Sequence, residues 1–218
     1  MSDNKPGECK FTERGLEIAA LKKGSRILDI GCGDGDTVNL LNEKGFQAEG
    51  IEINLVKINE AQEKYPGINI NFGDGSFMDG FMSFTFDGIM MENTLNAIGQ
   101  PDEALHEAYC VLKKGGRLII SDQYEIDPDP KQVKAVAIEA ARRAKLPHQE
   151  GDCEEGTPDH FVDFRLDGIF FKEPLIRYIE DEVGLRVMQF EDHSAELEAD
   201  SDETRKIGYF LLVAQKPL

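Results

Sequence analysis

Residues 26–36 of the chain read Arg-Ile-Leu-Asp-Ile-Gly-Cys-Gly-Asp-Gly-Asp. A short aliphatic run is followed by glycines at the alternate positions 31, 33 and 35, and apolar residues then return at helical spacing. This pattern predicts a strand, a tight glycine turn and a helix. Glycines let a ligand approach the backbone, and the start of a helix offers unpaired N–H groups with a partial positive charge. The stretch therefore predicts a ligand site at the end of the first strand.

The composition limits the class of protein and its partners. The 218 residues include 42 acidic and 24 basic side chains, a net charge of −18 with a pI near 4.6. Such a surface repels phosphate backbones and acidic membranes, so neither nucleic acid nor a membrane is expected as a partner. No apolar run approaches membrane-spanning length, and the N-terminal residues contain no signal-peptide core. The four scattered cysteines indicate reduced thiols, with no disulfide framework or metal site, and we expect a cytoplasmic protein.

The spacing of the glycines separates two kinds of nucleotide site. A dinucleotide turn, G-x-G-x-x-G, would need a glycine at position 36, which is aspartate. Residues 28–35, L-D-I-G-C-G-D-G, instead resemble the first motif of class I S-adenosylmethionine-dependent methyltransferases. They are most similar to the small-molecule branch, whose usual form is L-D-[VI]-G-C-G-T-G. Asp34 departs from that form, where the branch commonly has threonine.

Two later motifs extend the resemblance. Residues 85–89, T-F-D-G-I, match the family pattern S-F-D-x-[IV]. Residues 111–118, V-L-K-K-G-G-R-L, closely resemble its R-V-L-K-P-G-G-R-L signature without the proline. The resemblance covers residues 12–122. It implies a Rossmann-like α/β fold, with a seven-stranded, mostly parallel sheet in the order 3-2-1-4-5-7-6, helices on both faces and an antiparallel last strand.

The resemblance also implies where the cofactor, S-adenosylmethionine, binds. Glu52 ends the predicted second strand, residues 48–53, where its carboxylate can accept both hydrogen bonds of a ribose diol. Asp74 follows the predicted third strand, residues 68–72, in the place where family members bind the adenine amino group, and Phe77 or Met78 would flank the ring. The implied cofactor-binding residues are Asp29, Gly31, Cys32, Gly33, Glu52, Ile53, Asp74, Gly75, Ser76, Met91 and Glu92.

A helix is expected ahead of the first strand. Thr12 is predicted to be its N-cap, and Lys22-Lys23-Gly24 its cationic end and glycine stop. In the resembled family such a helix closes over the cofactor, which makes Thr12 and Arg14 candidate contacts to the methionine carboxylate. A helix cap and a surface cation explain the same two residues and are the favoured interpretation.

The motif pattern ends after residue 122. We predict helices over residues 132–145 and 170–182 and strands over residues 185–191 and 208–215. An acidic, irregular stretch lies at residues 147–165, between the two helices. We expect one domain over residues 1–218, with the segment Gln123–Phe171 as an insertion that covers the acceptor side.

The sequence assigns no catalytic residue. A sulfonium methyl is already electrophilic, so alignment supplies most of the acceleration and a base is needed only for a protonated acceptor. Candidate bases are Tyr124, His148, His160 and His193. Cys9 and Cys153 are candidate soft ligands for a thiol or metalloid acceptor, although the cysteine spacing known for arsenic methyltransferases is absent.

The favoured function is methyl transfer from S-adenosylmethionine to a small-molecule acceptor, with S-adenosylhomocysteine as product. Two alternatives stay open. One is a nicotinamide-dependent oxidoreductase on a related sheet, which the missing dinucleotide fingerprint disfavours. The other is a regulatory protein that binds the cofactor without transfer, which the missing base keeps open. The sequence does not specify the acceptor atom or the oligomeric state.

Overall fold

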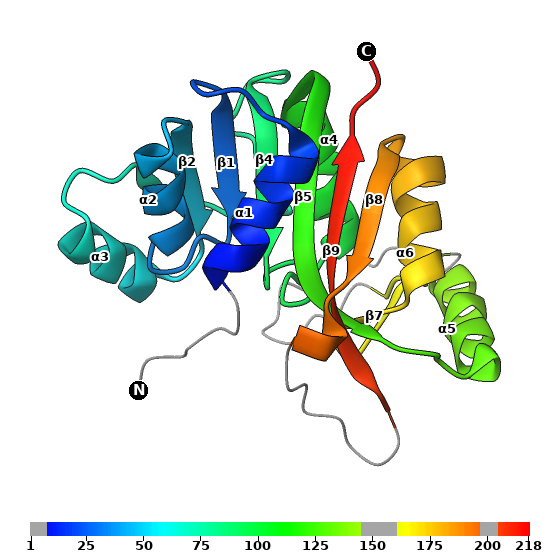
Figure 1. Cartoon of the computed structure of the whole chain (residues 1–218). Coiled ribbons are helices and arrows are strands. Elements are labelled where there is room, and N and C mark those ends of the chain that lie inside the picture. The colour runs from blue at the N-terminus through cyan, green and yellow to red at the C-terminus, as the bar shows by residue number, and fades with distance from the viewer. Residues whose placement is uncertain (1–7, 145–160, 197–204) are drawn as a thin grey trace.

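A twisted central sheet runs through the molecule, and the computed structural model describes residues 8–144, 161–196 and 205–218. Its parallel part consists of β3 (Ile70–Phe72), β2 (Gln47–Glu52), β1 (Arg26–Ile30), β4 (Phe86–Glu92) and β5 (Leu112–Glu125), in that spatial order. β9 (Ile207–Gln215) pairs antiparallel with β5, and β8 (Arg186–Asp192) pairs with β9 (Figure 1). The predicted order 3-2-1-4-5-7-6 is therefore confirmed, with β8 and β9 as its sixth and seventh strands.

The strands form because their side chains are apolar on both faces. Along β1, Ile27 faces one core cluster, whereas Leu28 and Ile30 face the other, as the period-two alternation of a strand requires. Parallel strands that carry such runs are stable only when helices cover both faces of the sheet. The glycine turn therefore leaves the end of a strand that is fixed from both sides.

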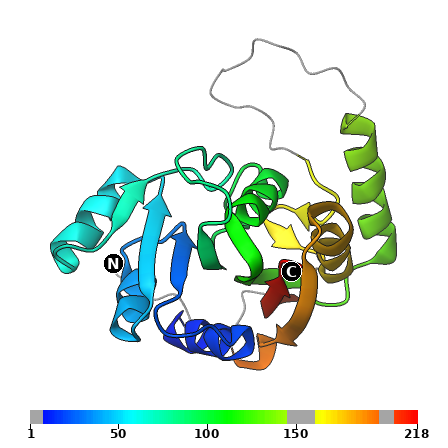
Figure 2. The ribbon, with the colours of Figure 1, turned by 90° about the horizontal axis from the view of Figure 1, so that it is seen from above.

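Helices cover the two faces of the sheet (Figures 1 and 2). The first face is covered by α1 (Glu8–Ala19), α2 (Asp36–Glu43) and α3 (Leu55–Lys64), which contribute Leu16, Leu41 and Ile58 to its core. The opposite face is covered by α4 (Pro101–Val111), α6 (Lys172–Arg177) and the π-helix η1 (Tyr178–Val183). A short 3₁₀ helix, η2 (Ser194–Glu196), follows β8. Within the described residues, no helix is long and apolar enough to cross a membrane.

The described parts of the predicted insertion are one helix and a short hairpin that extends the sheet. α5 (Pro130–Arg143) lies beyond α6 at the end of the molecule, with Val136 as its buried residue (Figure 2). The short strands β6 (Arg165–Leu166) and β7 (Ile169–Phe170) form a hairpin, and β7 pairs with β5 at Tyr124. Most of the acidic stretch, together with His148, Cys153 and His160, lies outside the described residues.

Several predicted boundaries were wrong, the following three among them. α1 begins at Glu8 and ends at Ala19, so Thr12 is an interior helix residue, buried to 1% exposure, and not an N-cap. The third strand is shorter than predicted and begins at Ile70. The helix predicted over residues 170–182 begins at Lys172 and continues as the π-helix from Tyr178.

Candidate functional site

The glycine turn lies where the first four parallel strands end. Gly31, Gly33 and Gly35 have φ angles of 71°, 55° and 85°, which favour residues without a side chain. A Cβ at Gly31 would also lie 2.4 Å from the Thr94 methyl group, because the loop after β4 crosses the turn. The turn backbone and the loop after β4 are thereby held against each other at the carboxyl edge of the sheet.

Glu52 connects the glycine turn to the end of β2. Its carboxylate is 7% exposed and accepts hydrogen bonds from the backbone N–H of Gly33 at 3.0 Å and of Asn54 at 2.8 Å. The Ile51 carbonyl accepts the N–H groups of Gly31 and Cys32 at 2.8 and 3.1 Å. A carboxylate has about four lone-pair sites, so Glu52 can still accept hydroxyl groups from a ligand.

A second carboxylate, that of Asp74, follows β3 at the same edge. Its Oδ1 accepts the Ser76 N–H at 2.9 Å and the Ser76 hydroxyl at 2.7 Å, which closes a tight turn. Gly75 is buried in this turn, and a Cβ there would lie 2.5 Å from Ile30. Two large apolar side chains near these carboxylates are exposed, Ile53 to 61% and Phe77 to 67%. Met78, the other predicted ring contact, is buried in the core. An acidic edge with exposed apolar side chains suits a flat heteroaromatic ring with amino groups.

Glu92, at the end of β4, has a different environment. The Thr12 hydroxyl of α1 donates to its two oxygens at 2.9 and 3.0 Å, and the Thr37 hydroxyl of α2 donates at 3.0 Å. The side chain is 9% exposed and joins two helices to the sheet. The other buried members of the implied cofactor set are Asp29 (3% exposed), Cys32 (6%) and Met91 (0%). Because the Cys32 and Met91 side chains are buried, these two residues can contact a ligand only through their backbone atoms.

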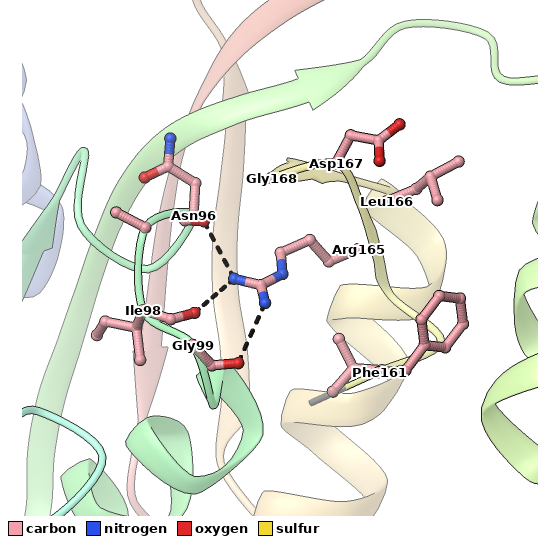
Figure 3. Close-up of a pocket in the computed structure, with 10 residues that line it drawn as sticks. Asn96, Ile98, Gly99, Phe161, Arg165, Leu166, Asp167 and Gly168 are labelled. Carbon is pink, nitrogen blue, oxygen red and sulfur yellow. Dashed lines mark hydrogen bonds between the residues drawn. The ribbon is translucent and has the colours of Figure 1, made fainter. Parts of the chain in front are cut away.

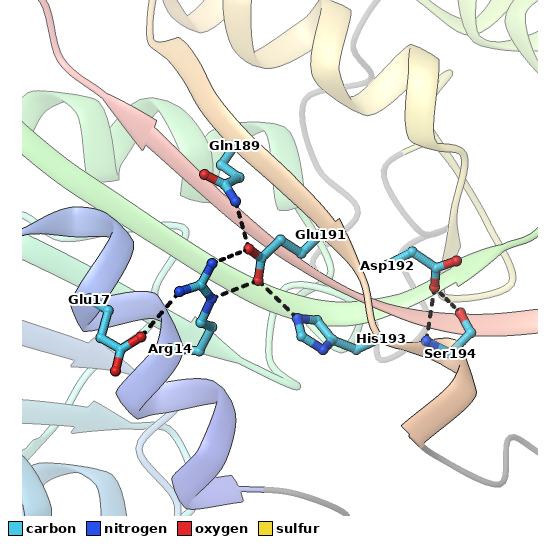
Figure 4. A network of polar contacts seen from close by, with 7 residues as sticks. All are labelled: Arg14, Glu17, Gln189, Glu191, Asp192, His193 and Ser194. Atoms are coloured by element: carbon cyan, nitrogen blue, oxygen red, sulfur yellow. Dashed lines mark hydrogen bonds and ion pairs between the residues drawn. The ribbon is translucent and has the colours of Figure 1, made fainter.

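α1 is anchored at its outer side to the end of β8. The Arg14 guanidinium donates to both Glu191 oxygens, from Nε at 3.0 Å and from Nη2 at 2.5 Å (Figure 4). Gln189 and His193 also contact this carboxylate, at 2.6 and 3.1 Å. The contacts with Arg14 and, to a smaller extent, His193 lower the pKa of Glu191 to about 2. Arg14 is thus an anchoring residue for α1, and its guanidinium is engaged by Glu191 and Glu17.

The loop after β4 is fixed by groups from β5 and β9. Asn93 has a φ of 50°, and its Oδ1 accepts the Tyr209 hydroxyl at 2.8 Å. The Asn96 N–H donates to Asp122 at 3.0 Å. Asp122 is fully buried, and burial raises its pKa to about 7, against the smaller effect of its hydrogen bonds. The loop is held in one conformation by polar groups beneath it.

A cavity of about 310 Å³ opens beside this loop. Its walls are residues 96–99, from the loop, and residues 161, 162 and 165–168, ahead of and within the β6–β7 hairpin. Arg165 spans the two walls and donates to the carbonyl oxygens of Asn96 at 3.0 Å, Ile98 at 2.6 Å and Gly99 at 3.3 Å (Figure 3). The buried Asn96 Oδ1 has no hydrogen-bond partner among the described residues. The Arg165 guanidinium thus ties the two walls of the cavity together.

Of the four candidate bases, Tyr124 and His193 lie within the described residues, and both are engaged in contacts of their own. Tyr124 is 6% exposed and packs edge-to-face on Phe190 and Phe210, and burial raises its pKa. His193 contacts Glu191 and the Phe11 ring. Cys9 lies in α1, but its side chain is outside the described part of the chain.

Sequence reasoning missed Asp122 and Arg165. An acidic residue at the carboxyl end of the fifth strand was a signal for the first. Nothing in the sequence signals that the Arg165 guanidinium reaches backbone carbonyls about 70 residues away.

The sequence matches a known protein family over the residues that form this edge of the sheet. A family model described as a methyltransferase domain matches residues 21–157, which include the glycine turn, Glu52 and Asp74. The chain belongs to this family of class I S-adenosylmethionine-dependent methyltransferases. The favoured family of the sequence analysis is therefore confirmed, and S-adenosylmethionine is the cofactor.

Individual relatives of this methyltransferase differ in what they act on. The 27-O-demethylrifamycin SV methyltransferase of Amycolatopsis mediterranei is 22% identical over 95% of this chain and 83% of its own length. The 18S rRNA (guanine-N(7))-methyltransferase of Mus musculus is 27% identical over 62% of this chain. Among solved structures, the [4+2]-cyclase SpnF is similar with a TM-score of 0.68 and 20% identity, over 96% of this chain and 81% of SpnF. The chain spans about half or less of several other curated methyltransferases that it matches.

Proposed function

We propose that this methyltransferase acts on a small-molecule acceptor, which binds over the end of β4 and in the cavity between residues 96–99 and 161–168. The observation that carries the proposal is the cavity, because it opens beside the loop that follows the cofactor motifs. Its volume of about 310 Å³ lies at the lower end of the range for small-molecule sites. The net charge of −18 also favours such an acceptor over a nucleic acid.

The cofactor roles follow from the residues at the carboxyl edge. S-adenosylmethionine, when bound, supplies an electrophilic methyl group on a sulfonium. Glu52 accepts the ribose hydroxyls, and its bonds to Gly33 and Asn54 fix the carboxylate for this role. The turn Asp74–Ser76 receives the adenine edge, with the ring against the exposed Ile53 and Phe77. The backbone of Gly31–Gly33 and of Met91–Glu92 lies beside the methionine part.

The acceptor side contributes alignment and exclusion of water. Asn93 and Asn96 lie on the loop after β4. Hydrogen bonds with Tyr209, Asp122 and Arg165 hold this loop in place, so a methyl acceptor bound there meets hydrogen-bonding groups in fixed positions. A preorganised loop of this kind supplies proximity and orientation, which can carry most of the acceleration of a displacement at carbon. A deprotonated nucleophile then needs no protein base.

A radiolabelled methyl-transfer assay tests the proposal. The protein is incubated with S-adenosylmethionine and either a fractionated metabolite extract or total RNA. We expect label in small molecules and none in RNA. Label in RNA would contradict the small-molecule acceptor. Tight cofactor binding without transfer to either pool would favour a regulatory protein.

Arg165→Lys separates the acceptor side from the cofactor side. Lysine keeps the charge but loses the planar fork that reaches several carbonyl oxygens, so the loop of residues 96–99 should loosen. We expect a higher KM for the acceptor with little change in cofactor affinity. Arg186→Lys, on the exposed side of β8, is the matched control and should change neither. An unchanged acceptor KM in Arg165→Lys would place the acceptor elsewhere.

A further inference from the structure

A second hollow lies at the other edge of the sheet, where β1, β4 and β5 begin. It has a volume of about 170 Å³ and is lined by residues 19–22 and 25, by Asp87, and by residues 113–117. β4 runs from this hollow to Glu92 at the cofactor edge, and at about 3.3 Å per residue the two sites are roughly 16 Å apart. The hollow is therefore separate from the glycine turn and from the acceptor cavity.

The hollow concentrates positive charge in a strongly acidic protein. Lys22, Lys113, Lys114 and Arg117 line it, against Asp87 as its one carboxylate. Both Asp87 oxygens accept from the Lys113 ammonium at 2.9 Å, and one also accepts the Arg26 N–H. Neither Lys22 nor Lys114 forms an ion pair with a described residue. Asp87 is thus neutralised by Lys113, and Lys22, Lys114 and Arg117 have no carboxylate partner among the described residues.

Of these three cations, Arg117 is the one that is partly buried. One guanidinium nitrogen donates to the Gly115 carbonyl, and the buried Nε has no hydrogen-bond partner among the described residues. Burial lowers the pKa of Arg117, and no carboxylate acts in the opposite direction. A buried N–H group without a hydrogen-bond partner is costly, and this one belongs to a cation. Among the acidic residues that the structure describes, Asp87 is the one that lines the hollow, and it is paired with Lys113.

We propose that this hollow binds a phosphate group, as inorganic phosphate or as the end of a phosphorylated metabolite. Arginine offers a planar fork to such an oxyanion, and the two lysines offer mobile point charges. A water occupies about 30 Å³ in the liquid, so 170 Å³ holds a tetrahedral oxyanion with a few waters. The Leu218 side chain also lies close, beside Gly115.

Calorimetry with sodium phosphate tests the proposal on the full chain at pH 7.5, with ionic strength held constant by sodium chloride. We expect one saturable site, and a weaker affinity by about tenfold or more in Lys22→Gln/Lys114→Gln, because two charge-assisted contacts are lost. Both lysines are exposed, so this variant should fold. Lys57→Gln, on the exposed side of α3, is the matched control and should bind phosphate as the unchanged protein does. Pyrophosphate and a nucleoside monophosphate, titrated in the same way, distinguish free phosphate from a phosphorylated metabolite.

A second arm of the experiment locates the bound phosphate. Helix starts also bind anions, so phosphate could instead occupy the glycine turn at the start of α2. If phosphate binds in the hollow where β1, β4 and β5 begin, saturation with S-adenosylhomocysteine should leave the phosphate affinity unchanged. Loss of phosphate binding with S-adenosylhomocysteine, heat no greater than with chloride, or equal affinity in the double variant would each overturn the proposal.

Discussion

At the scale of single residues, Gly31 shows why the turn has glycine where it does. A Cβ there would meet the Thr94 side chain at 2.4 Å, and the φ of 71° is itself unfavourable for other residues. The steric and conformational causes can be separated, because only the first involves Thr94.

We predict that Gly31→Ala lowers the free energy of unfolding by about 2 kcal/mol or more. Thr94→Ala in the same chain should recover part of the loss, since it removes the methyl and hydroxyl that the new Cβ would strike. The conformational part should remain. Urea unfolding of the two single variants and the double variant checks this, and full recovery in the double variant would contradict a conformational contribution.

Glu52→Ala should weaken S-adenosylmethionine binding by roughly 1.5–3 kcal/mol, the range for hydrogen bonds to a charged group. The control is Glu49→Ala on the same strand, whose carboxylate pairs with Arg26 at the other end of β2. Titration calorimetry measures both. Because Glu52 also binds two backbone N–H groups, circular dichroism should first establish that the variant is folded. An unchanged dissociation constant would reduce Glu52 to a turn-stabilising residue.

Asp122 should make the protein less stable as the pH rises. Its folded pKa of about 7 lies above the ordinary value of 3.8, so between these values the folded state keeps a proton that the unfolded state has lost. The free energy of unfolding therefore falls with rising pH in this window, by up to about 1.4 kcal/mol per unit. Asp122→Asn should show a weaker fall between pH 5 and pH 7 in urea titrations. Parallel curves for the two proteins would contradict the raised pKa.

The residues of the site differ in how far the sequence could place them. Glu52 and Asp74 could be put at the carboxyl edge because each directly ends or follows a short apolar strand, and strand ends locate ligands in parallel sheets. Thr12 could not, because a hydroxyl near a helix start has the same local pattern whether it caps the helix or bonds to a distant carboxylate. The Thr12–Glu92 pair joins residues 80 positions apart, and only the packing of α1 brings them together.

At the scale of elements, α1 is held to the site by two polar contacts on different sides. Thr12 bonds to Glu92 at the end of β4, and Arg14 bonds to Glu191 at the end of β8. Phe11 packs between them, on the Tyr209 ring at 4.9 Å and the His193 ring at 5.0 Å. The position of α1 over the carboxyl edge is therefore fixed by a central strand, β4, and by the edge strand β8.

We predict that Arg14→Gln weakens cofactor binding severalfold by loosening α1, while the melting temperature changes little because the ion pair is partly exposed. The effect should be smaller in a Glu191→Gln background, where the pair is already broken. Calorimetry on the four proteins of the cycle measures this. If Arg14→Gln lowers the cofactor affinity equally in the unchanged and the Glu191→Gln proteins, Arg14 acts on the cofactor independently of Glu191.

The β6–β7 hairpin could not be predicted from the sequence. β6 and β7 have two residues each, too few for alternation to be visible, and β7 becomes a strand by pairing with Tyr124 of β5. The longer strands β1, β4, β8 and β9 were found within a residue or two, because each carries enough apolar residues to show its period.

At the scale of the whole molecule, the net charge of −18 opposes the compact state through self-repulsion. Raising sodium chloride from 0.1 to 1 M shortens the Debye length from about 10 to about 3 Å, so the melting temperature at pH 7 should rise. The rise should be smaller at pH 5, close to the pI of 4.6, where the net charge is small. Calorimetric melts at both pH values check this. An equal rise at both would indicate a general salt effect and not screening.

β9 is the last strand in chain order but lies inside the sheet, between β5 and β8. During synthesis, β5 leaves the ribosome long before Ile207–Gln215 is made. Until then, the edge of β5 that includes Leu118–Ile120 has backbone groups that only β9 will pair, and such an edge invites pairing with other chains. The nascent cofactor half can begin to assemble, yet its sheet stays open on one side. Translation that stalls before residue 207 therefore leaves a chain that chaperones must hold or proteases remove.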